Sequence, residues 1–352
     1  MRAGILTLQE ADNYGAVLQA YALQRALMRL AVESEFIMFE QEMGSEQNKC
    51  EDTSQSRIFA KRLREKARMR SDLFDDFRRK NLKYSEVISK QRAKELNDRY
   101  DFFIVGSDQV WNFTIPGVDG RYFLPFVEPD KRFSYAASFG GSMIPEQLRD
   151  WCAQQLKHFS KISVREKQGQ EIVRELIGRD SVICIDPVFL LERAEWERLT
   201  FKVEGEPYLL LYLIQYNRDA FDYANRLSND RKIKVKIVTA SFMSACGIDA
   251  WNSVGVQEWI SLIKNADSVI TDSFHGCAFS LIFGRPLSVI CLKDSLKGRS
   301  GRVEEILKKT DMEECMKGKL MEISESNLAA CMRDAVQDAY KYLKEIVEGV
   351  NS

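Results

Sequence analysis

The chain has 352 residues, of which 45% are hydrophobic and 29% are charged, and its net charge is −1. Because this length exceeds what one ordinary hydrophobic core fills, we expect two domains. The near-neutral charge argues against a nucleic-acid partner, and no stretch approaches the roughly 20 apolar residues of a membrane-spanning helix.

Predicted strands and helices alternate through the N-terminal half. A strand over 3–8, a helix over 14–30 and a strand over 35–40 predict a βαβ unit, because apolar residues recur on one face of the helix. The polar segment 41–56 is expected to form a loop. The elements predicted after it are a basic helix over 57–70 that continues through 80, a strand and loop over 100–112, a strand over 132–140, a helix over 145–159 and a strand over 161–166.

The same alternation restarts near residue 167. The predicted helices cover 167–177, 217–229, 256–265, 275–283 and 325–347, and the predicted strands cover 181–187, 208–214, 234–240, 268–272 and 287–290. This pattern predicts an α/β fold of two Rossmann-like domains whose parallel sheets face each other across a cleft, with ligands at the carboxyl ends of the strands. We expect the domains to cover 1–166 and 167–324, and a C-terminal helix within 325–352 to cross back to the first domain.

The cysteines and histidines indicate the compartment and argue against a bound metal. The eight cysteines are scattered without a CxxC pair, which is typical of reduced thiols in a cytoplasm. The two histidines, His158 and His275, lie far apart, so we expect no histidine-rich metal site. The segment "MRAGILTLQEADNYG" lacks the pattern of a signal peptide, and we therefore expect a cytoplasmic protein.

Polar residues follow two predicted strands of the first half. After the first strand, Asp12 and Asn13 are good helix caps and Gly15 lets a ligand approach the backbone, which suits an anion or sugar hydroxyls. The segment lacks a GxGxxG fingerprint, and a capped turn without a ligand is the alternative. After the strand near 100–105, four polar residues surround the indole of Trp111, a combination typical of sugar or base recognition; the four are Ser107, Asp108, Gln109 and Asn112.

The second set of strand ends supplies cationic and titratable residues. Arg165 ends an apolar strand and can direct its guanidinium into the cleft, although a surface salt bridge is the alternative. Asp186 precedes Pro187, a pair more typical of a turn.

A predicted helix begins near His275. Asp272 or Ser273 can cap this helix, and its positive dipole end favours a neutral imidazole that can accept a proton. A purely structural histidine is the alternative, which is how we interpret His158 at the end of its own helix. A glycine-containing loop that precedes another helix could bind an anion or could simply be a basic surface loop; its cations are Lys293, Lys297, Arg299 and Arg302.

Taken together and in this order, six stretches of the chain resemble the polysaccharide pyruvyl transferase family. They are "GILTLQEADNYGAVLQAYALQ", "DFFIVGSDQVWN", "SYAASFG", "ISVRE", "IDPVFLL" and "VITDSFHGCAFSLIFGRPL". The resemblance implies a GT-B-like fold and transfer of a pyruvyl group from phosphoenolpyruvate to a diol of a sugar. The product would be a cyclic pyruvate ketal in the biosynthesis of a cell-surface polysaccharide such as a capsule or exopolysaccharide. Phosphoenolpyruvate would be a co-substrate, and no cofactor or metal is implied.

The resemblance also implies roles for individual residues. His275 matches the histidine of the family's histidine-glycine motif and would be the catalytic acid/base, and Arg165 matches an arginine expected to bind phosphoenolpyruvate. Relatives often carry arginine two positions before the histidine, where this chain has Ser273, so Arg299 or Arg302 would have to neutralise the donor. We assign the acceptor sugar to first-domain residues, which are Asn13, Tyr14, Gly15, Asp108, Gln109, Trp111 and Asn112.

Two partner questions stay open at this point. The acceptor sugar can be nucleotide- or lipid-linked or part of a polysaccharide repeat unit, and the basic stretch 57–70 either contacts the inner face of the membrane or is a solvated helix face. A GT-B-type nucleotide-sugar glycosyltransferase, or a non-catalytic sugar-binding relative, is the alternative function.

Overall fold

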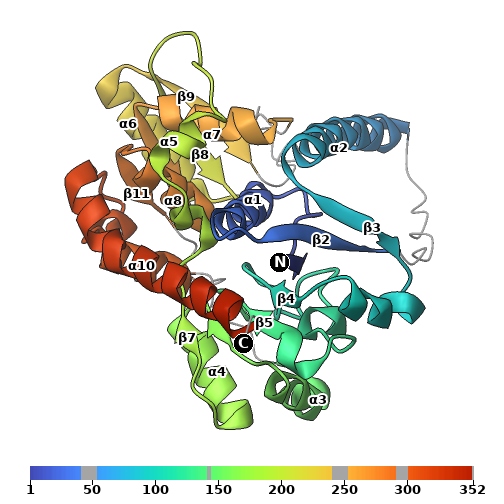
Figure 1. Ribbon diagram of the computed structural model, residues 1–352. Helices are drawn as coiled ribbons and strands as arrows, with labels where there is room; N and C mark the ends of the chain where they lie inside the picture. The colour runs from blue at the N-terminus through green and yellow to red at the C-terminus, as the bar shows by residue number, and fades with distance from the viewer. Residues whose placement is uncertain (41–53, 141–143, 240–252, 291–299, 351–352) are drawn as a thin grey trace.

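Two parallel β-sheets organise the chain in a computed structural model that describes residues 1–40, 54–140, 144–239, 253–290 and 300–350 (Figure 1). The first sheet has the strand order β3-β2-β1-β4-β5, and every neighbouring pair in it is parallel. Its strands are β1 (Arg2–Leu6), β2 (Glu33–Phe39), β3 (Tyr84–Ile88), β4 (Phe102–Val105) and β5 (Arg132–Ser134). The second sheet has the order β11-β10-β8-β9 and is also parallel. Its strands are β8 (Tyr208–Leu213), β9 (Lys234–Thr239), β10 (Ser268–Thr271) and β11 (Leu287–Val289).

Helices connect most of the neighbouring strands and cover the sheets, as parallel strands require. The strand-helix alternation predicted from the sequence is confirmed, and β3 is an element that the sequence did not predict. The helices are α1 (Tyr14–Arg29), α2 (Ser54–Asn81), α3 (Glu146–Lys157), α4 (Lys167–Ile177), α5 (Arg193–Glu197), α6 (Arg218–Arg231), α7 (Val256–Asn265), α8 (Phe274–Ile282), α9 (Ser300–Lys309) and α10 (Glu325–Val350). Most of the predicted loop 41–56 lies outside the described residues, and α2 begins within its last residues.

The first domain extends beyond the boundary predicted at residue 166. The short strands β6 (Ser163–Val164) and β7 (Val182–Ile183) pair in parallel, and two parallel bridges, Phe133 to Lys161 and Ala137 to Val164, continue the first sheet from β5 onto β6. Helix α4 and strand β7 therefore belong to the first domain. The sequence pattern restarts at 167 because one more βα unit follows β6, and this unit adds to the existing sheet.

An apolar interface joins the two domains. The ring of Tyr14 at the start of α1 stacks on the indole of Trp259 in α7, with centroids 4.9 Å apart and planes within 2°. The Tyr14 hydroxyl donates a hydrogen bond to the carbonyl of Val254 at 2.9 Å. One hydrophobic core runs through residues of both domains, so the interface packs like a protein interior and fixes the domains against each other.

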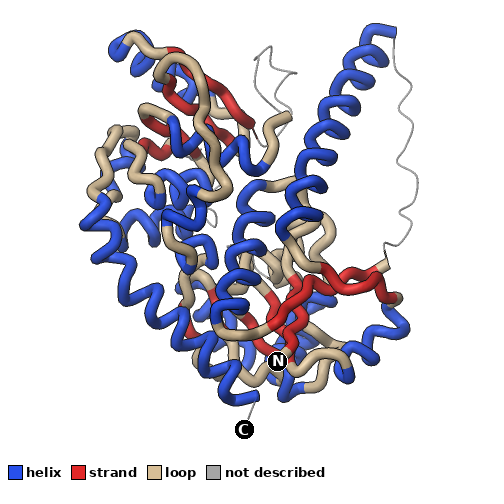
Figure 2. Tube along the Cα trace, turned by 45° about the horizontal axis from the view of Figure 1, so that its top comes forward, coloured by secondary structure: helices blue, strands red, loops and turns tan. Residues whose placement is uncertain are grey.

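Two long helices reinforce this arrangement, as the turned view shows (Figure 2). Helix α10 runs from the second domain to the first, where Tyr342 donates to the Ser134 carbonyl at 2.9 Å. On the other side, the buried Arg70 of α2 donates to the carbonyls of Asp12 and Thr239, which belong to different domains. Both helices therefore tie the first domain to the second.

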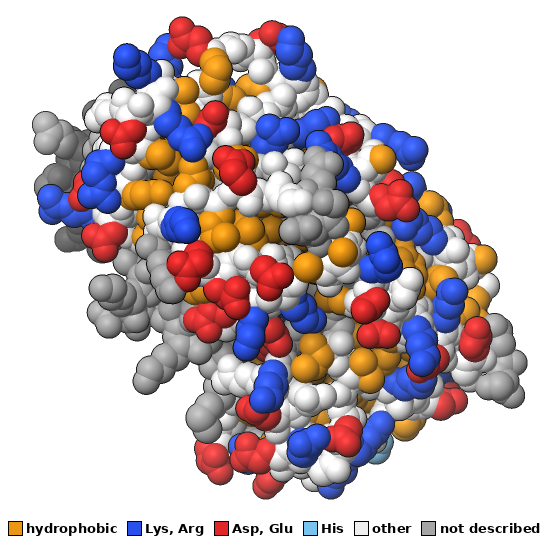
Figure 3. Space-filling model, turned by 90° about the vertical axis from the view of Figure 1, so that its left-hand side faces the viewer, with side chains coloured by type: hydrophobic (Ala, Val, Ile, Leu, Met, Phe, Trp, Pro, Cys, Tyr) orange, Lys and Arg blue, Asp and Glu red, His pale blue; other side chains and the backbone are white. Residues whose placement is uncertain are grey.

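The surface carries mixed charge. Acidic and basic side chains are interspersed over the face shown in Figure 3, in keeping with the net charge of −1. None of the described helices is both long and apolar enough to cross a membrane.

Candidate active site

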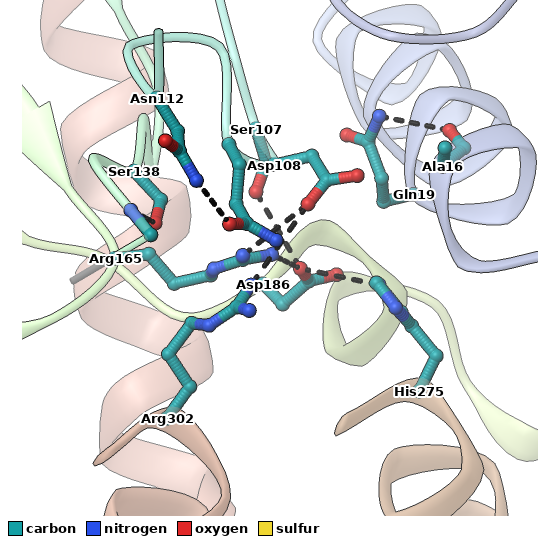
Figure 4. Close-up of polar contacts among 12 residues, drawn as sticks. Ala16, Gln19, Ser107, Asp108, Asn112, Ser138, Arg165, Asp186, His275 and Arg302 are labelled. Atoms are coloured by element: carbon teal, nitrogen blue, oxygen red, sulfur yellow. Dashed lines mark hydrogen bonds and ion pairs between the residues drawn. The ribbon is translucent and has the colours of Figure 1, made fainter. Parts of the chain in front are cut away.

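A buried cluster of charged side chains lies where the two domains meet (Figure 4). The loop after β4, the end of β6 and the segment after β7 contribute from the first sheet, while α8 and α9 contribute from the second domain. The cluster thus sits at carboxyl ends of parallel strands, where ligands of such folds bind. Its members are Asp108, Arg165, Glu166, Asp186, His275 and Arg302.

Arg165 lies within ion-pair distance of three carboxylates of the cluster, those of Asp108, Glu166 and Asp186. Its Nη1 donates to Asp186 Oδ2 at 2.7 Å and its Nη2 donates to Asp108 Oδ1 at 3.3 Å. The guanidinium carbon also lies 5.2 Å from the centroid of the Phe274 ring. Burial alone would lower the pKa of Arg165, but the carboxylates of Asp186, Asp108 and Glu166 raise it above its ordinary value. The predicted donor-binding arginine is therefore fully charged and already paired inside the protein.

Asp186 links this arginine to the histidine. Its Oδ2 lies 3.6 Å from His275 Nε2 and its Oδ1 accepts the Val188 N–H at 3.1 Å. Burial alone would raise the pKa of Asp186, but the charges of His275 and Arg165 and the Val188 N–H hold it below its ordinary value. The carboxylate is consequently ionised although its side chain is completely enclosed.

The local sequence fixes where His275 stands. Ser273 is the N-cap of α8, and its hydroxyl accepts the Gly276 N–H at 3.2 Å, which places His275 in the first turn. A Cβ at Gly276 would lie 2.5 Å from Thr271 Oγ1, so only glycine lets the helix start this close to β10. Asp272 is not the cap, because its carboxylate accepts the N–H groups of Ile214 and Gln215.

His275 also touches the first domain. A Cβ at Gly15 would lie 1.9 Å from His275 Nδ1, so the imidazole occupies the space that any other residue would fill. The histidine is 8% exposed overall, and its Nε2 is buried without a hydrogen-bond partner. Gly15 is predicted to let a ligand approach the backbone, and in the structure the group that approaches it is the imidazole of His275.

Arg302 is the least satisfied cation of the cluster. It is 7% exposed, its Nε has no hydrogen-bond partner, and its Nη1 lies 3.9 Å from Asp108 Oδ1. Burial, reinforced by the positive charge of Arg165, lowers the pKa of Arg302 to about 10 although the nearby carboxylates oppose the shift. The predicted partner cation, Arg299, lies outside the described residues.

Several buried polar atoms around the cluster lack partners. Besides those of His275 and Arg302, they include Arg165 Nε, Glu166 Oε2 and Gln19 Oε1. A small pocket of about 30 Å³ adjoins Arg165, Asp186 and Arg302 and is also lined by Glu305 and Lys309. Unsatisfied buried groups of this kind are uncommon, and together they are typical of a place where a polar ligand binds.

The predicted acceptor residues divide into two groups. Asn13 caps α1 by accepting the Ala16 N–H, and Asp108 belongs to the charged cluster. Tyr14 and Trp111 are core residues, 0% and 1% exposed, and the Trp111 indole donates to the Tyr122 carbonyl. The structure therefore does not bring these two aromatic rings to the charged cluster.

The amides of Gln109 and Asn112 hold the loop after β4. Asn112 Nδ2 donates to Gln109 Oε1 at 2.9 Å, and both amides lie against the backbone of Gly140, where a Cβ would come within 2.5 Å of each. Asn112 Oδ1 in turn accepts the N–H and hydroxyl of Thr114. These interactions shape the loop that carries Asp108.

Sequence reasoning underrated Asp186 and missed Glu166 and Lys309. Asp186 stands at a strand end, the signal that identified Arg165, but the following proline suggested only a turn. Its side chain does cap the short 3-10 helix Pro187–Leu190, and it also reaches His275, so both interpretations hold for this residue. Within the described residues, no group of three potential metal ligands converges.

Two facing parallel-sheet domains with a polar cluster between them define the GT-B-like class of α/β proteins. A family model described as polysaccharide pyruvyl transferase matches residues 13–290, so the chain belongs to that family. No curated protein matches the chain.

Solved structures confirm the fold. A UDP-GlcNAc 2-epimerase from Neisseria meningitidis bound to UDP-GlcNAc aligns with a TM-score of 0.52 and 10% identity, covering 99% of each chain. The S. aureus MnaA–UDP structure aligns at 0.51 and 10% identity over 96% of this chain and 89% of that one. The UDP-GlcNAc 2-epimerase from Methanocaldococcus jannaschii aligns at 0.50 and 13% identity over 95% and 92%.

Proposed function

We propose that the protein transfers the pyruvyl group of phosphoenolpyruvate to two hydroxyls of a sugar, forming a cyclic ketal and releasing phosphate. The observation that carries this proposal is the grouping of His275 with two buried guanidinium groups at the domain junction, in a chain of the pyruvyl transferase family. Phosphoenolpyruvate has a carboxylate and a phosphate, and both require cationic or hydrogen-bond donors.

Arg302 is the proposed anchor of the donor. Its contact with Asp108, at 3.9 Å, is longer than a hydrogen bond, and its Nε lacks a partner, so an incoming anion gains a cation at little cost in existing bonds. Lys309 lines the adjoining pocket with it and is a second proposed anchor. The pocket, at about 30 Å³, is too small for phosphoenolpyruvate as it stands, and we propose that Arg302 turns away from Asp108 when the donor binds. Arg299 remains a proposed donor contact, and Ser273 contributes by capping α8.

His275 is the proposed acid/base. One sugar hydroxyl attacks C2 of the donor while C3 gains a proton and becomes a methyl group, and a second hydroxyl then displaces phosphate from C2. The histidine accepts the proton of the attacking hydroxyl and delivers it to C3, and the proton of the second hydroxyl leaves with the phosphate; this proton transfer contributes roughly 100- to 10,000-fold. Holding the donor and the diol between two packed domains reduces the entropic cost of the encounter.

The acceptor is proposed to lie on the first domain, beside the loop that leads to Gly15. A groove of about 650 Å³ flanks this loop and runs between α2 and strand β3. Its wall combines carboxylates, hydroxyls and guanidinium groups, the groups that bind sugar hydroxyls; they come from Glu10, Asp12, Ser71, Asp75, Arg78, Arg79, Tyr84 and Ser85. Asp108 and Asn13 are the predicted acceptor residues that we retain.

One observation weakens the glycosyltransferase alternative. A nucleotide-sugar enzyme would hold a ribose in the second domain with a carboxylate, and Asp272 stands at the appropriate strand end. Both of its oxygens accept backbone N–H groups, at 2.7 and 3.2 Å, so this carboxylate is engaged in holding the β8 loop.

The deciding experiment incubates the full chain with phosphoenolpyruvate and a panel of sugar acceptors. Phosphate release that depends on the acceptor, with a ketal seen in the product by NMR, supports the proposal. Release of UDP from a UDP-sugar would instead support a glycosyltransferase. If neither phosphate nor UDP is released, the result would support a non-catalytic sugar-binding protein.

Helix α2 is proposed to contact an anionic membrane. Arg64, Lys66 and Arg68 are exposed on it, whereas Arg70 is buried at the domain junction and belongs to the fold. The triple change of the three exposed residues to glutamate, with Arg70 kept, is expected to abolish sedimentation with anionic vesicles. Unchanged sedimentation would contradict this part of the proposal.

A further inference from the structure

Hydrogen-bond donors contact both oxygens of the Asp186 carboxylate. Its Oδ1 accepts the Val188 N–H at 3.1 Å, and its Oδ2 receives Arg165 Nη1 at 2.7 Å and faces the Ser107 hydroxyl at 3.5 Å. The side chain has no exposed surface. A carboxylate restrained by a backbone N–H and a buried guanidinium has little freedom to turn, so the direction of its remaining lone pair is fixed.

That remaining direction leads to His275. Nε2 of the imidazole lies 3.6 Å from Asp186 Oδ2 and is buried with no other partner. The separation is longer than an ordinary hydrogen bond, and catalytic hydrogen bonds in unliganded enzymes are often long and tighten when substrate binds. Because an ionised carboxylate only accepts hydrogen bonds, the neutral imidazole is stabilised when its proton is on Nε2.

The other ring nitrogen faces the first domain. Nδ1 is the atom nearest to the position of a Cβ on Gly15, so this edge of the ring lies against the start of α1. With the proton on Nε2, the lone pair is on Nδ1. We infer that Asp186 is a positioning residue which fixes the Nε2–H tautomer of His275 and makes Nδ1 the nitrogen that exchanges protons with the acceptor hydroxyl.

This inference rests on the proposed catalytic role of His275 and changes the role of Arg165. The guanidinium bridges Asp186 and Asp108, and Glu166 Oε2 lies 3.9 Å from its Nε. Arg165 therefore acts through Asp186, as a second positioning residue, and Arg302 is the cation left for the donor. The charged groups around the histidine–aspartate pair are Asp108, Arg165, Glu166 and Arg302.

Replacement of Asp186 by asparagine removes the negative charge and keeps the size and shape of the side chain. At the Oδ2 position the asparagine places either a neutral oxygen, which holds the Nε2 proton less strongly, or an amide nitrogen, which donates to Nε2 and moves the imidazole proton to Nδ1; both weaken the base. By the behaviour of other histidine–carboxylate pairs, we expect kcat to fall by about 100- to 10,000-fold. The KM for phosphoenolpyruvate should stay within about threefold, because the aspartate does not contact the donor in this scheme.

The tautomer can be observed directly, because the chain contains only two histidines. NMR of the full chain with ¹⁵N-labelled imidazoles gives two ring systems, and His158→Gln assigns them. In the neutral form we expect His275 to carry its proton on Nε2, and a proton on Nδ1 would overturn the inference. This measurement needs neither donor nor turnover, so its outcome is independent of whether the proposed reaction is correct.

Kinetic measurements provide a second test of the inference. Asp186→Asn should lower kcat and move the acidic limb of the pH–rate profile to lower pH, because the protonated imidazole loses its counter-charge. Asp180→Asn is the matched control, since Asp180 forms an exposed pair with Arg174. Wild-type kcat with an unmoved acidic limb in Asp186→Asn would refute the positioning role. If that variant fails to fold, a proton on Nδ1 in the wild-type protein still overturns the inference.

Discussion

Replacing Arg302 with methionine should stabilise the unliganded protein. Burial and the neighbouring Arg165 lower the pKa of Arg302 from its ordinary value to about 10, so the folded state holds this proton less tightly than the unfolded state does. Stability therefore rises as the pH increases from about 10 towards the ordinary pKa of arginine, and the full penalty of burying the charge is present below pH 10. Each unit of pKa difference corresponds to 1.36 kcal/mol, so removal of the charge is worth at most about 3 kcal/mol.

The assay is urea unfolding at pH 7.5 with and without phosphoenolpyruvate. Arg302→Met should unfold at a higher urea concentration than wild type when no donor is present, and it should gain no stability from the donor. Wild type should gain stability with donor concentration, because a ligand that binds only the folded state stabilises it. Arg302→Lys keeps a buried charge and should not be more stable than wild type when no donor is present. An unliganded Arg302→Met that is less stable than wild type would refute the reasoning.

Three further substitutions test the site. His275→Gln should retain the fold and lose at least about 100-fold in rate, whereas His158→Gln, at the end of α3, should not; near-normal turnover of the first variant would contradict the acid/base role. Gly15→Ala places a Cβ 1.9 Å from the imidazole and should also cost about 100-fold, while Gly349→Ala, with open space around it, serves as control. Lys309→Met should raise the KM for phosphoenolpyruvate about tenfold by removing a charged contact. Lys308→Met, which changes the exposed neighbour outside the pocket, should leave that KM unchanged, and equal values for the two lysine variants would exclude Lys309 as a donor anchor.

Much of the fold could be predicted because each parallel βα unit has its own hydrophobic periodicity. The predicted strand over 268–272 and helix over 275–283 correspond to β10 and α8 within a residue or two. The domain boundary could not be predicted in the same way. β6 and β7 have two residues each. They extend the first sheet because of long-range contacts such as the bridge between Ala137 and Val164, and the local sequence pattern does not predict such contacts.

The candidate site was predictable where a charged residue ends a strand. This rule places Asp108, Arg165 and His275 in one cluster. It fails for Tyr14 and Trp111, whose polar neighbours suggested ligand contacts. Their rings turn into the core instead, because an aromatic ring gains more from stacking on Trp259 or Phe123 than from a solvated position.

The cluster also connects donor binding to the contact between domains. Asp108 comes from the loop after β4 and Arg302 from α9, so their 3.9 Å approach is an ion pair across the domain junction. If Arg302 turns to the donor as proposed, Asp108 retains only Arg165, and one electrostatic link between the domains is exchanged for a link through the substrate. The other links between the domains include the stack of Tyr14 on Trp259, the hydrogen bond from the Tyr14 hydroxyl to the Val254 carbonyl and the bond from Arg70 to the Thr239 carbonyl, and none of them involves Arg302. Donor binding should therefore change the local electrostatics at the acceptor side of the site without opening the interface, which suits a reaction in which His275 must stay against Gly15 throughout.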